Sequence, residues 1–321
     1  MGQHCRAIWQ LLAVWCLFSA SSALPIRTDV ASYLDIKKYT LTYLIDFKND
    51  NFSGVVDIDI KVKKPFATRK SLVLDKADLT IVDISLKDGA SSVLPVPFDD
   101  GNDNITLNLP VVLNLQSSYT VSLRFLGKIR DTNSEGIIKY EARNNTYITT
   151  NLFPFYAHRA FPCFNDAFIK SIFSLTISIE GAAAGVYPLT NTPLAYKNNK
   201  NTVFQFKDTP PIPVHNLFFT VGYYEKTGKN GNIYVYKKNA ITFNKEIEYT
   251  LDDEVYKKLL NISKIPSVNI VAIPGLPRET ITSYGIVAIS ENNLFMDLKR
   301  VTTEQRKVSL LNIFSGLYKL F

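Results

Sequence analysis

Hydrophobic and polar residues alternate with a period of two along most of the chain between about residues 35 and 236. Each alternating run places its apolar side chains on one face and mostly polar side chains on the other, as half-buried antiparallel strands require. Turn sequences such as Asp99-Asp100-Gly101-Asn102 and Lys229-Asn230-Gly231-Asn232 separate the runs. The pattern predicts an all-β domain of the sandwich type. The clearest apolar sets are Tyr39, Leu41, Tyr43, Ile45 and Phe47; Val56, Ile58, Ile60 and Val62; Tyr119, Val121, Leu123 and Phe125; and Phe173, Leu175, Ile177 and Ile179.

After about residue 240 the apolar residues recur at helical spacing. The sequence Thr250-Leu251-Asp252-Asp253 resembles a capping box and predicts the start of one helix. A second helix is predicted from Thr302-Thr303-Glu304-Gln305, which also fits a capping box. This second helix has one apolar face, formed by Leu310, Phe314, Leu317 and Phe321.

Two short apolar runs between these helices predict two strands, at Val268–Ile273 and Gly285–Ile289. The second region is therefore expected to be α+β. Its last helix has no returning chain after Phe321 to cover its apolar face, so we expect this second domain to be incomplete.

Residues 1–23 have the features of a secretory signal peptide. Arg6 supplies a positive charge, an apolar run extends from Ala7 to Phe18, and Ser21-Ser22-Ala23 places small residues before the cleavage site. The run is too short to cross a membrane comfortably and no later run is longer, so we expect a secreted chain without a membrane span. A short buried helix or a signal anchor is the weaker alternative. An anchor beyond Phe321 would instead place the chain on the extracellular face of the plasma membrane.

Composition narrows the function classes only slightly. With 46% hydrophobic and 20% charged residues the chain is expected to be globular. Its net charge of +7 comes from scattered Lys and Arg residues, so no nucleic-acid partner is expected, whereas weak attraction to an anionic cell surface stays open. Cys163 is the one cysteine after the signal peptide, and its apolar neighbours predict a buried small residue instead of a nucleophile. Four N-glycosylation sequons predict surface positions at Asn51, Asn104, Asn144 and Asn261.

Four segments, at residues 159–166, 215–222, 271–274 and 284–294, together resemble the aminopeptidase N family of zinc metallopeptidases. The segment Arg159–Asp166 resembles the family sequence RAFPCFDEP, but has Asn165 in place of Asp. The order and spacing of the matches hold over roughly residues 30–321. The resemblance implies a β-rich, saddle-shaped first domain at 24–238 and a partial thermolysin-like catalytic domain at 239–321. The other matching segments are His215–Gly222, Val271–Pro274, which is similar to VALPDF, and Tyr284–Val287 with Glu291 and Leu294, which is similar to WGLVTYRE.

The family holds a catalytic zinc ion with two His residues of an HExxH helix and a Glu further along the chain, leaving one coordination position open. The resemblance places HExxH on Ile313–Leu317 or, one residue later, on Phe314–Tyr318. Neither window contains a His or a Glu. The metal and base positions are thus degenerate at Ile313, Phe314, Ser315, Leu317 and Tyr318, and no zinc or other cofactor is expected. The family's third zinc ligand and its catalytic Tyr lie beyond Phe321.

The substrate-amine positions are degenerate as well. The family's GAMEN segment falls on Glu279–Ser283, where Thr282 replaces its Glu, although Glu279 nearby leaves a weak alternative. A TQFE-like segment falls on residues 150–153, where Phe153 replaces the Glu and Asn151 the Gln. The mature chain also has only two His residues, His158 and His215, with no metal-ligand spacing, and its Ser and Asp residues form no recognisable triad.

Three hypotheses follow. The preferred one is a catalytically inactive, secreted aminopeptidase-like glycoprotein that binds an unidentified protein or cell-surface partner, as a binding module or decoy. The alternative is a fragment or divergent member of an active zinc aminopeptidase that removes N-terminal residues from peptides. The third is an unstable remnant, whose uncovered helix face invites aggregation.

Overall fold

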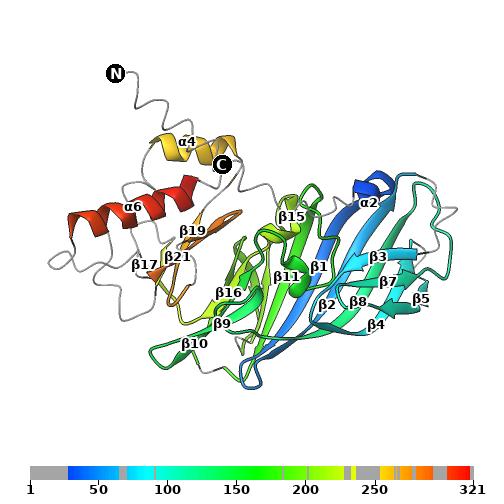
Figure 1. Cartoon of the computed structure of the whole chain (residues 1–321), viewed down its shortest axis with the longest axis horizontal. Coiled ribbons are helices and arrows are strands. Elements are labelled where there is room, and N and C mark those ends of the chain that lie inside the picture. Colours follow the sequence, from blue (N-terminus) through cyan, green and yellow to red (C-terminus); the bar gives the residue numbers. More distant parts are fainter. Residues whose placement is uncertain are drawn as a thin grey trace, which may run out of the picture.

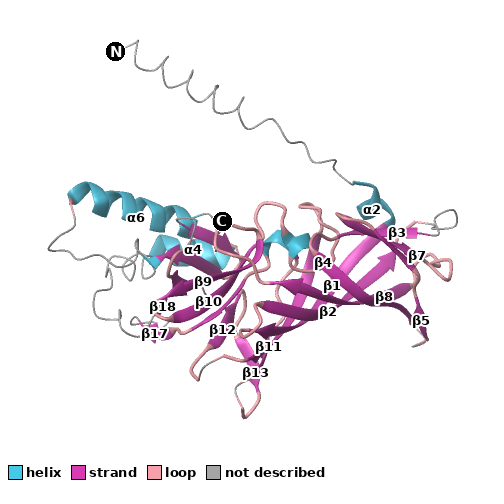
Figure 2. Cartoon of the chain, turned by 60° about the horizontal axis from the view of Figure 1, so that its bottom comes forward, coloured by secondary structure: helices cyan, strands magenta, loops and turns pink. Residues whose placement is uncertain are grey.

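The structure is a computed structural model that describes residues 28–64, 71–89, 92–182, 184–200, 202–227, 233–235, 254–263, 265, 268–276, 280–291 and 302–318. Within these residues the chain is mainly β and its strands form four sheets, which confirms the predicted fold class. The molecule is elongated, with helices α4 and α6 at one end and strands β3 and β7 at the other (Figures 1 and 2). The helices are α2 (Thr28–Tyr33), α4 (Glu254–Ile262) and α6 (Thr303–Tyr318), with 3-10 turns η1 (Ala157–Arg159) and η2 (Val214–Asn216).

The largest sheet has the strand order β13-β14-β11-β1-β2-β8-β4-β5, with β15 paired to β11. All of its pairs are antiparallel except β1 with β11. The apolar sets predicted from the alternation are buried as expected, and Phe47 alone is only partly buried. The strands are β1 (Leu34–Asp46), β2 (Asn51–Val62), β4 (Leu79–Asp88), β5 (Val93–Pro95), β8 (Ser118–Lys128), β11 (Lys170–Glu180), β13 (Leu194–Lys197), β14 (Val203–Phe206) and β15 (Ile212–Pro213).

Two smaller sheets complete the β-rich part. One has the order β12-β16-β10-β9 and the other the order β3-β7-β6. The predicted Asp99–Asn102 turn joins β6 to β7. The strands are β3 (Ser71–Asp75), β6 (Phe98–Asp100), β7 (Asn104–Asn108), β9 (Gly136–Ala142), β10 (Asn145–Asn151), β12 (Tyr187–Thr190) and β16 (Phe219–Gly222).

A fourth sheet has the order β17-β18-β19-β21-β20. Strands β19 and β21 are the two that the sequence predicts, and β20 at the edge was not predicted. Strands β17 and β18 also pair into this sheet, although they precede the predicted boundary at residue 238. This fourth sheet belongs to the second part of the molecule and is called the second sheet below. It begins at Glu225. The strands are β17 (Glu225–Thr227), β18 (Ile233–Val235), β19 (Asn269–Ile273), β20 (Thr280–Ser283) and β21 (Ile286–Ser290).

The second sheet is buried on both faces. Ile270 and Val287 pack in one apolar cluster with Leu317 of helix α6. Their strand neighbours Val271 and Ile286 point the other way and pack against the four-stranded sheet. Parallel strands buried on both sides show continuous apolar runs, which explains the unbroken sequence of β19. The apolar contact on the face of Val271 and Ile286 joins the two parts of the molecule.

Several sequence-based expectations lie outside the described residues. They are the signal peptide at 1–23, the Lys229–Asn232 turn, the Thr250–Asp253 cap, Glu279, Leu294 and Phe321. The same holds for the side chains of Leu310, Ile313, Phe314 and Tyr318. The predicted second helix is confirmed as α6. None of the described helices is long and apolar enough to cross a membrane.

Candidate functional site

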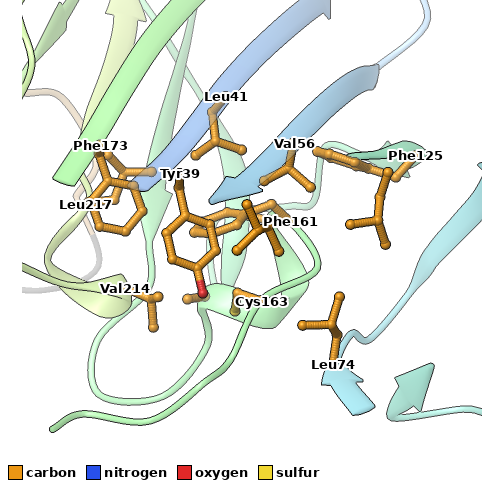
Figure 3. Packing of buried hydrophobic residues seen from close by; sticks show 14 of the residues in the cluster. Tyr39, Leu41, Val56, Leu74, Phe125, Phe161, Cys163, Phe173, Val214 and Leu217 are labelled. Atoms are coloured by element: carbon orange, nitrogen blue, oxygen red, sulfur yellow. The ribbon is translucent and has the colours of Figure 1, made fainter. Parts of the chain in front are cut away.

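The segment that carries the strongest resemblance, Arg159–Asp166, is a structural element of the core. Phe161 and Cys163 are fully buried and pack around Tyr39 (Figure 3). The hydroxyl of Tyr43 donates to the carbonyl oxygen of Ala160 at 3.1 Å, and the backbone amide of Phe164 donates to the hydroxyl of Tyr39 at 3.2 Å. This segment therefore packs into the core of the β-rich part and is held there by hydrogen bonds to Tyr39 and Tyr43.

Cys163 is a free, buried thiol, as the sequence predicts. Burial raises the pKa of this thiol well above its usual range, and the carboxylate of Asp75 adds to the effect. Because the thiolate is the reactive form, Cys163 is unsuited to act as a nucleophile.

The substitution at Asn165 has a local explanation. Its amide nitrogen lies 2.7 Å from the carbonyl oxygen of Phe155 and 2.9 Å from Nδ1 of His158. An amide nitrogen only donates, so Nδ1 of His158 accepts and the ring is neutral. A carboxylate at this position could not donate to either acceptor.

His158 and His215 lie in separate surroundings. Burial lowers the pKa of both His158 and His215, so each favours its neutral form. The ring of His215 packs edge-on against the ring of Phe153 with their centroids 5.9 Å apart. Among the described residues, no group of three or more His, Cys, Asp or Glu side chains is placed to hold a metal.

The positions that correspond to HExxH lie on α6, which packs against β20 and β21. Leu317 is fully buried in the apolar cluster of the second sheet, whereas Ser315 is exposed. The backbone at Gly316 approaches the sheet so closely that an added Cβ would lie 3.0 Å from Cγ2 of Thr280 and 3.2 Å from Cγ1 of Val287. At this point the helix and the sheet are joined by apolar packing.

Thr282, at the amine-binding position, lies directly against this helix. Its hydroxyl donates to the carbonyl oxygen of Gly316 at 2.9 Å. The structure thus brings the amine-binding and HExxH positions together. At the positions that the resemblance assigns to these two functions, the contact is made by a neutral hydroxyl and a backbone carbonyl group.

Zinc does not fit these residues. A zinc site requires imidazole, thiolate or carboxylate ligands. Ile313, Phe314, Ser315, Leu317 and Tyr318 supply none of these, whichever register is taken. Thr282 cannot replace the charge of a Glu.

Phe153 and Asn151 lie at the end of β10, near the junction of the two parts. Asn151 is buried and its amide donates to the carbonyl oxygen of Ser134 at 3.0 Å, while its Oδ1 has no hydrogen-bond partner among the described residues. Phe153 is 52% exposed and contacts His215. The position that the resemblance assigns to the family's acidic side chain therefore carries an exposed aromatic ring.

Asn191 connects the two parts of the molecule, a role that the sequence did not reveal. Its amide nitrogen has two N–H groups, which three acceptors share: the carbonyl oxygens of Asn216 and Tyr284, at 3.0 and 2.9 Å, and Oγ of Ser283, at 2.9 Å. Its Oδ1 accepts from the backbone amide of Phe218 at 2.7 Å. The hydroxyl of Ser283 also donates to the carbonyl oxygen of Asn216. This buried network fixes β20, and so Thr282, relative to the β-rich part.

A second connection is ionic. Nη1 of Arg143 lies 3.0 and 2.8 Å from the two carboxylate oxygens of Glu291, which directly follows β21. The side chain of Glu291 is 8% exposed and that of Arg143 is 41% exposed. Arg143 occupies the turn between β9 and β10, so the pair holds this turn to the second sheet.

The four sequon asparagines are accessible to different degrees. Asn51, Asn144 and Asn261 are exposed, and Asn104 at the start of β7 is partly buried. Their glycosylation stays a prediction.

Comparison with known proteins identifies the family. A family profile described as the Peptidase M1 N-terminal domain matches residues 36–215, more than half of the chain. The chain is 25% identical to a puromycin-sensitive aminopeptidase of Caenorhabditis elegans over 280 residues, covering 80% of this chain and 28% of the relative. It is 23% identical to human aminopeptidase Q over 240 residues, covering 68% and 24%. It is 22% identical to a leucyl aminopeptidase of Saccharolobus solfataricus over 274 residues, covering 82% and 32%. The chain thus spans about a quarter to a third of the length of these relatives.

Proposed function

Because the chain belongs to the M1 peptidase family, we propose that it is a secreted, catalytically inactive relative that acts by binding and not by cleaving peptides. One observation carries the proposal. The amine-binding position, Thr282, bonds to the backbone of the helix that corresponds to HExxH, and that helix offers no zinc ligand at the matching positions. A catalytic zinc ion needs three protein ligands, so losing the two on this helix removes the metal that the chemistry requires.

The loss extends to substrate recognition. A free peptide amino terminus is positively charged and is bound best by a nearby carboxylate. Here the two corresponding positions are the hydroxyl of Thr282 and the ring of Phe153. The site is therefore unsuited to hold peptide amino termini. A role as a binding module or decoy would use another part of the chain's surface.

Three exposed aromatic side chains support a binding role. Phe153, Phe155 and Phe168 are 52%, 36% and 78% exposed, and all belong to the connection between β10 and β11. The bond from Asn165 to the carbonyl oxygen of Phe155 ties the two ends of this connection together. Aromatic side chains are enriched in protein interfaces, where they supply a large share of the binding energy. A protein on a cell surface is the partner class that secretion favours.

The test has two arms. The secreted, purified chain is expected to release no amino acids from unblocked peptides, with or without added zinc. Zinc-dependent release would instead favour the alternative, a divergent aminopeptidase. For binding, labelled protein is expected to bind cells saturably, and F153S/F155S/F168S is expected to remove that binding.

The matched control changes three exposed apolar residues elsewhere, V82S/V93S/L126S, whose side chains are 47%, 57% and 47% exposed. This control is expected to bind like the parent chain. Equal binding by the aromatic variant, or equal loss in the control, would contradict a role for the aromatic surface.

A further inference from the structure

A cavity lies where the β-rich part meets the second sheet. Its volume is about 590 Å³, within the range of about 300–1,000 Å³ typical of small-molecule sites. Strands β12, β13 and β14 and the end of β11 line it from one side, and Tyr234 of β18 and Asn269 of β19 line it from the other. Figure 2 shows β12 and β18 at this junction.

The inner wall of the cavity is apolar. Val186, Leu189, Phe204 and Phe206 all line it, and each is less than 9% exposed. These side chains belong to the hydrophobic clusters of the protein, so the wall is formed by the packed core. An apolar ligand would therefore enter a preformed surface.

The charged side chains described at the cavity are positive. Lys197 and Lys200 line it and are exposed, and no Asp or Glu lies among the lining residues that the structure describes. Neither ammonium group has a carboxylate partner in the part of the chain that the structure describes. Tyr187 and Tyr234 also line the cavity, and burial raises the pKa of both hydroxyls, so both side chains are neutral at physiological pH. The cavity combines an apolar wall with a cationic rim.

We propose that this cavity binds a small carboxylate with an apolar tail, the tail lying against Val186, Phe204 and Phe206 and the carboxylate facing Lys197 and Lys200. Charge complementarity selects the anion, since the two ammonium groups repel a cationic head and attract a neutral head less strongly than a carboxylate. The apolar wall selects the tail through burial of its surface. The proposal concerns a different part of the molecule from the degenerate peptidase positions and does not depend on them.

Titration calorimetry of the purified chain with octanoate, decanoate and dodecanoate tests the proposal. We expect saturable binding of one ligand per chain, with affinity rising by up to about fourfold per added methylene until the cavity is filled. Decanoate is expected to bind more tightly than decanol, and decanol more tightly than decylamine. Equal binding of decanoate and decylamine, or no saturable binding, would overturn the proposal.

Two pairs of variants locate the site. K197E/K200E is expected to weaken decanoate binding about tenfold and to leave decanol binding unchanged. K87E/K170E changes two exposed lysines of the same β-rich part and is expected to leave both unchanged. L194W, at a 43% exposed lining residue, is expected to weaken every ligand, whereas V93W on the β5 edge is not. Unchanged decanoate binding in K197E/K200E, or an equal loss in K87E/K170E, would contradict the assignment.

Discussion

The hydroxyl of Thr282 donates a hydrogen bond to the backbone carbonyl oxygen of Gly316 at 2.9 Å. The bond joins the edge strand that corresponds to the family's amine-binding segment to the helix that corresponds to its HExxH segment. In an active relative these two positions need charged and metal-binding side chains. Here the hydroxyl of Thr282 contacts the helix backbone, so the two segments that the resemblance matches to these functions meet in one packed interface.

The close approach at Gly316 predicts an unusual response to Ala. Ala is the better helix former by about 1 kcal/mol, but overpacking a tight contact costs about 1–3 kcal/mol. Because the added Cβ would press on Thr280 and Val287, Gly316→Ala is expected to lower the free energy of unfolding by about 1 kcal/mol. Denaturant titration measures the change. The exposed neighbour provides the control: Ser315→Ala is expected to be neutral or slightly stabilising, and equal stabilisation by both would contradict the packing.

Asn191 predicts a large effect from a single polar substitution. Asn191→Ala removes a donor to Asn216, Ser283 and Tyr284 and leaves the buried amide of Phe218 without its acceptor. Each buried group left unsatisfied costs about 1–3 kcal/mol, so the free energy of unfolding is expected to fall by about 3 kcal/mol. Asn108→Ala, which loses one exposed bond to Asp99, is expected to cost less than about 1 kcal/mol. Similar losses in the two variants would refute the connecting role of Asn191.

The pair of Arg143 and Glu291 predicts that the effects of substituting the two residues on stability are not additive. Arg143→Ala removes the guanidinium from a buried carboxylate and is expected to cost about 2 kcal/mol, below the cost of breaking a fully buried pair because Arg143 is partly exposed. Adding Glu291→Gln is expected to recover part of that loss. The control is Arg124→Ala, whose partner Asp83 lies 3.7 Å away at the exposed surface, with an expected change below about 0.5 kcal/mol. Additive single and double variants would contradict the coupling.

Both His residues predict a loss of stability in mild acid. Burial lowers the pKa of His158 and His215 in the folded state, so the unfolded chain binds protons more readily. Stability from these residues is therefore complete above the usual His pKa of about 6.5 and falls as the pH drops below it. The free energy of unfolding is expected to decrease between about pH 7 and pH 5.

The variant H158Q/H215Q isolates this effect and is expected to flatten the pH dependence in that interval. Asp46 and Asp208 also have lowered pKa values, from hydrogen bonds to Asn49 and Lys38 respectively. Their stabilisation is lost only near and below about pH 4, so the two effects occur in separate intervals. An unchanged slope between pH 7 and pH 5 in the variant would exclude the His residues as its cause.

Local sequence patterns predicted the elements whose structure depends least on contacts with distant parts of the chain. The strict alternation in β1, β2, β8 and β11 predicted buried faces correctly because each strand carries its own pattern. The helical spacing after Thr302 likewise predicted α6. Strand β20 was missed because its short sequence, Thr280–Ser283, has no apolar face and is held by pairing with β21.

The remaining differences depend on partners distant in sequence. The short strands β17 and β18 follow the β-rich pattern locally, but their position is decided by pairing of β18 with β19. Nothing in the local sequence distinguishes Asn191 from other polar residues, because its partners Asn216 and Ser283 are distant in sequence and meet it only in the folded structure. The resemblance gives the degenerate positions, which stay a prediction, whereas the contact between Thr282 and Gly316 is known only from the folded structure.

The metal content of the purified chain tests the central claim most directly. After expression in zinc-supplemented medium and extensive dialysis, the chain is expected to retain well below one zinc ion per molecule, because residues 313–318 supply no ligand. An active aminopeptidase of the same family, prepared in parallel, provides the positive control. One tightly held zinc ion per chain, lost with a chelator and accompanied by release of amino acids from peptides, would contradict the account.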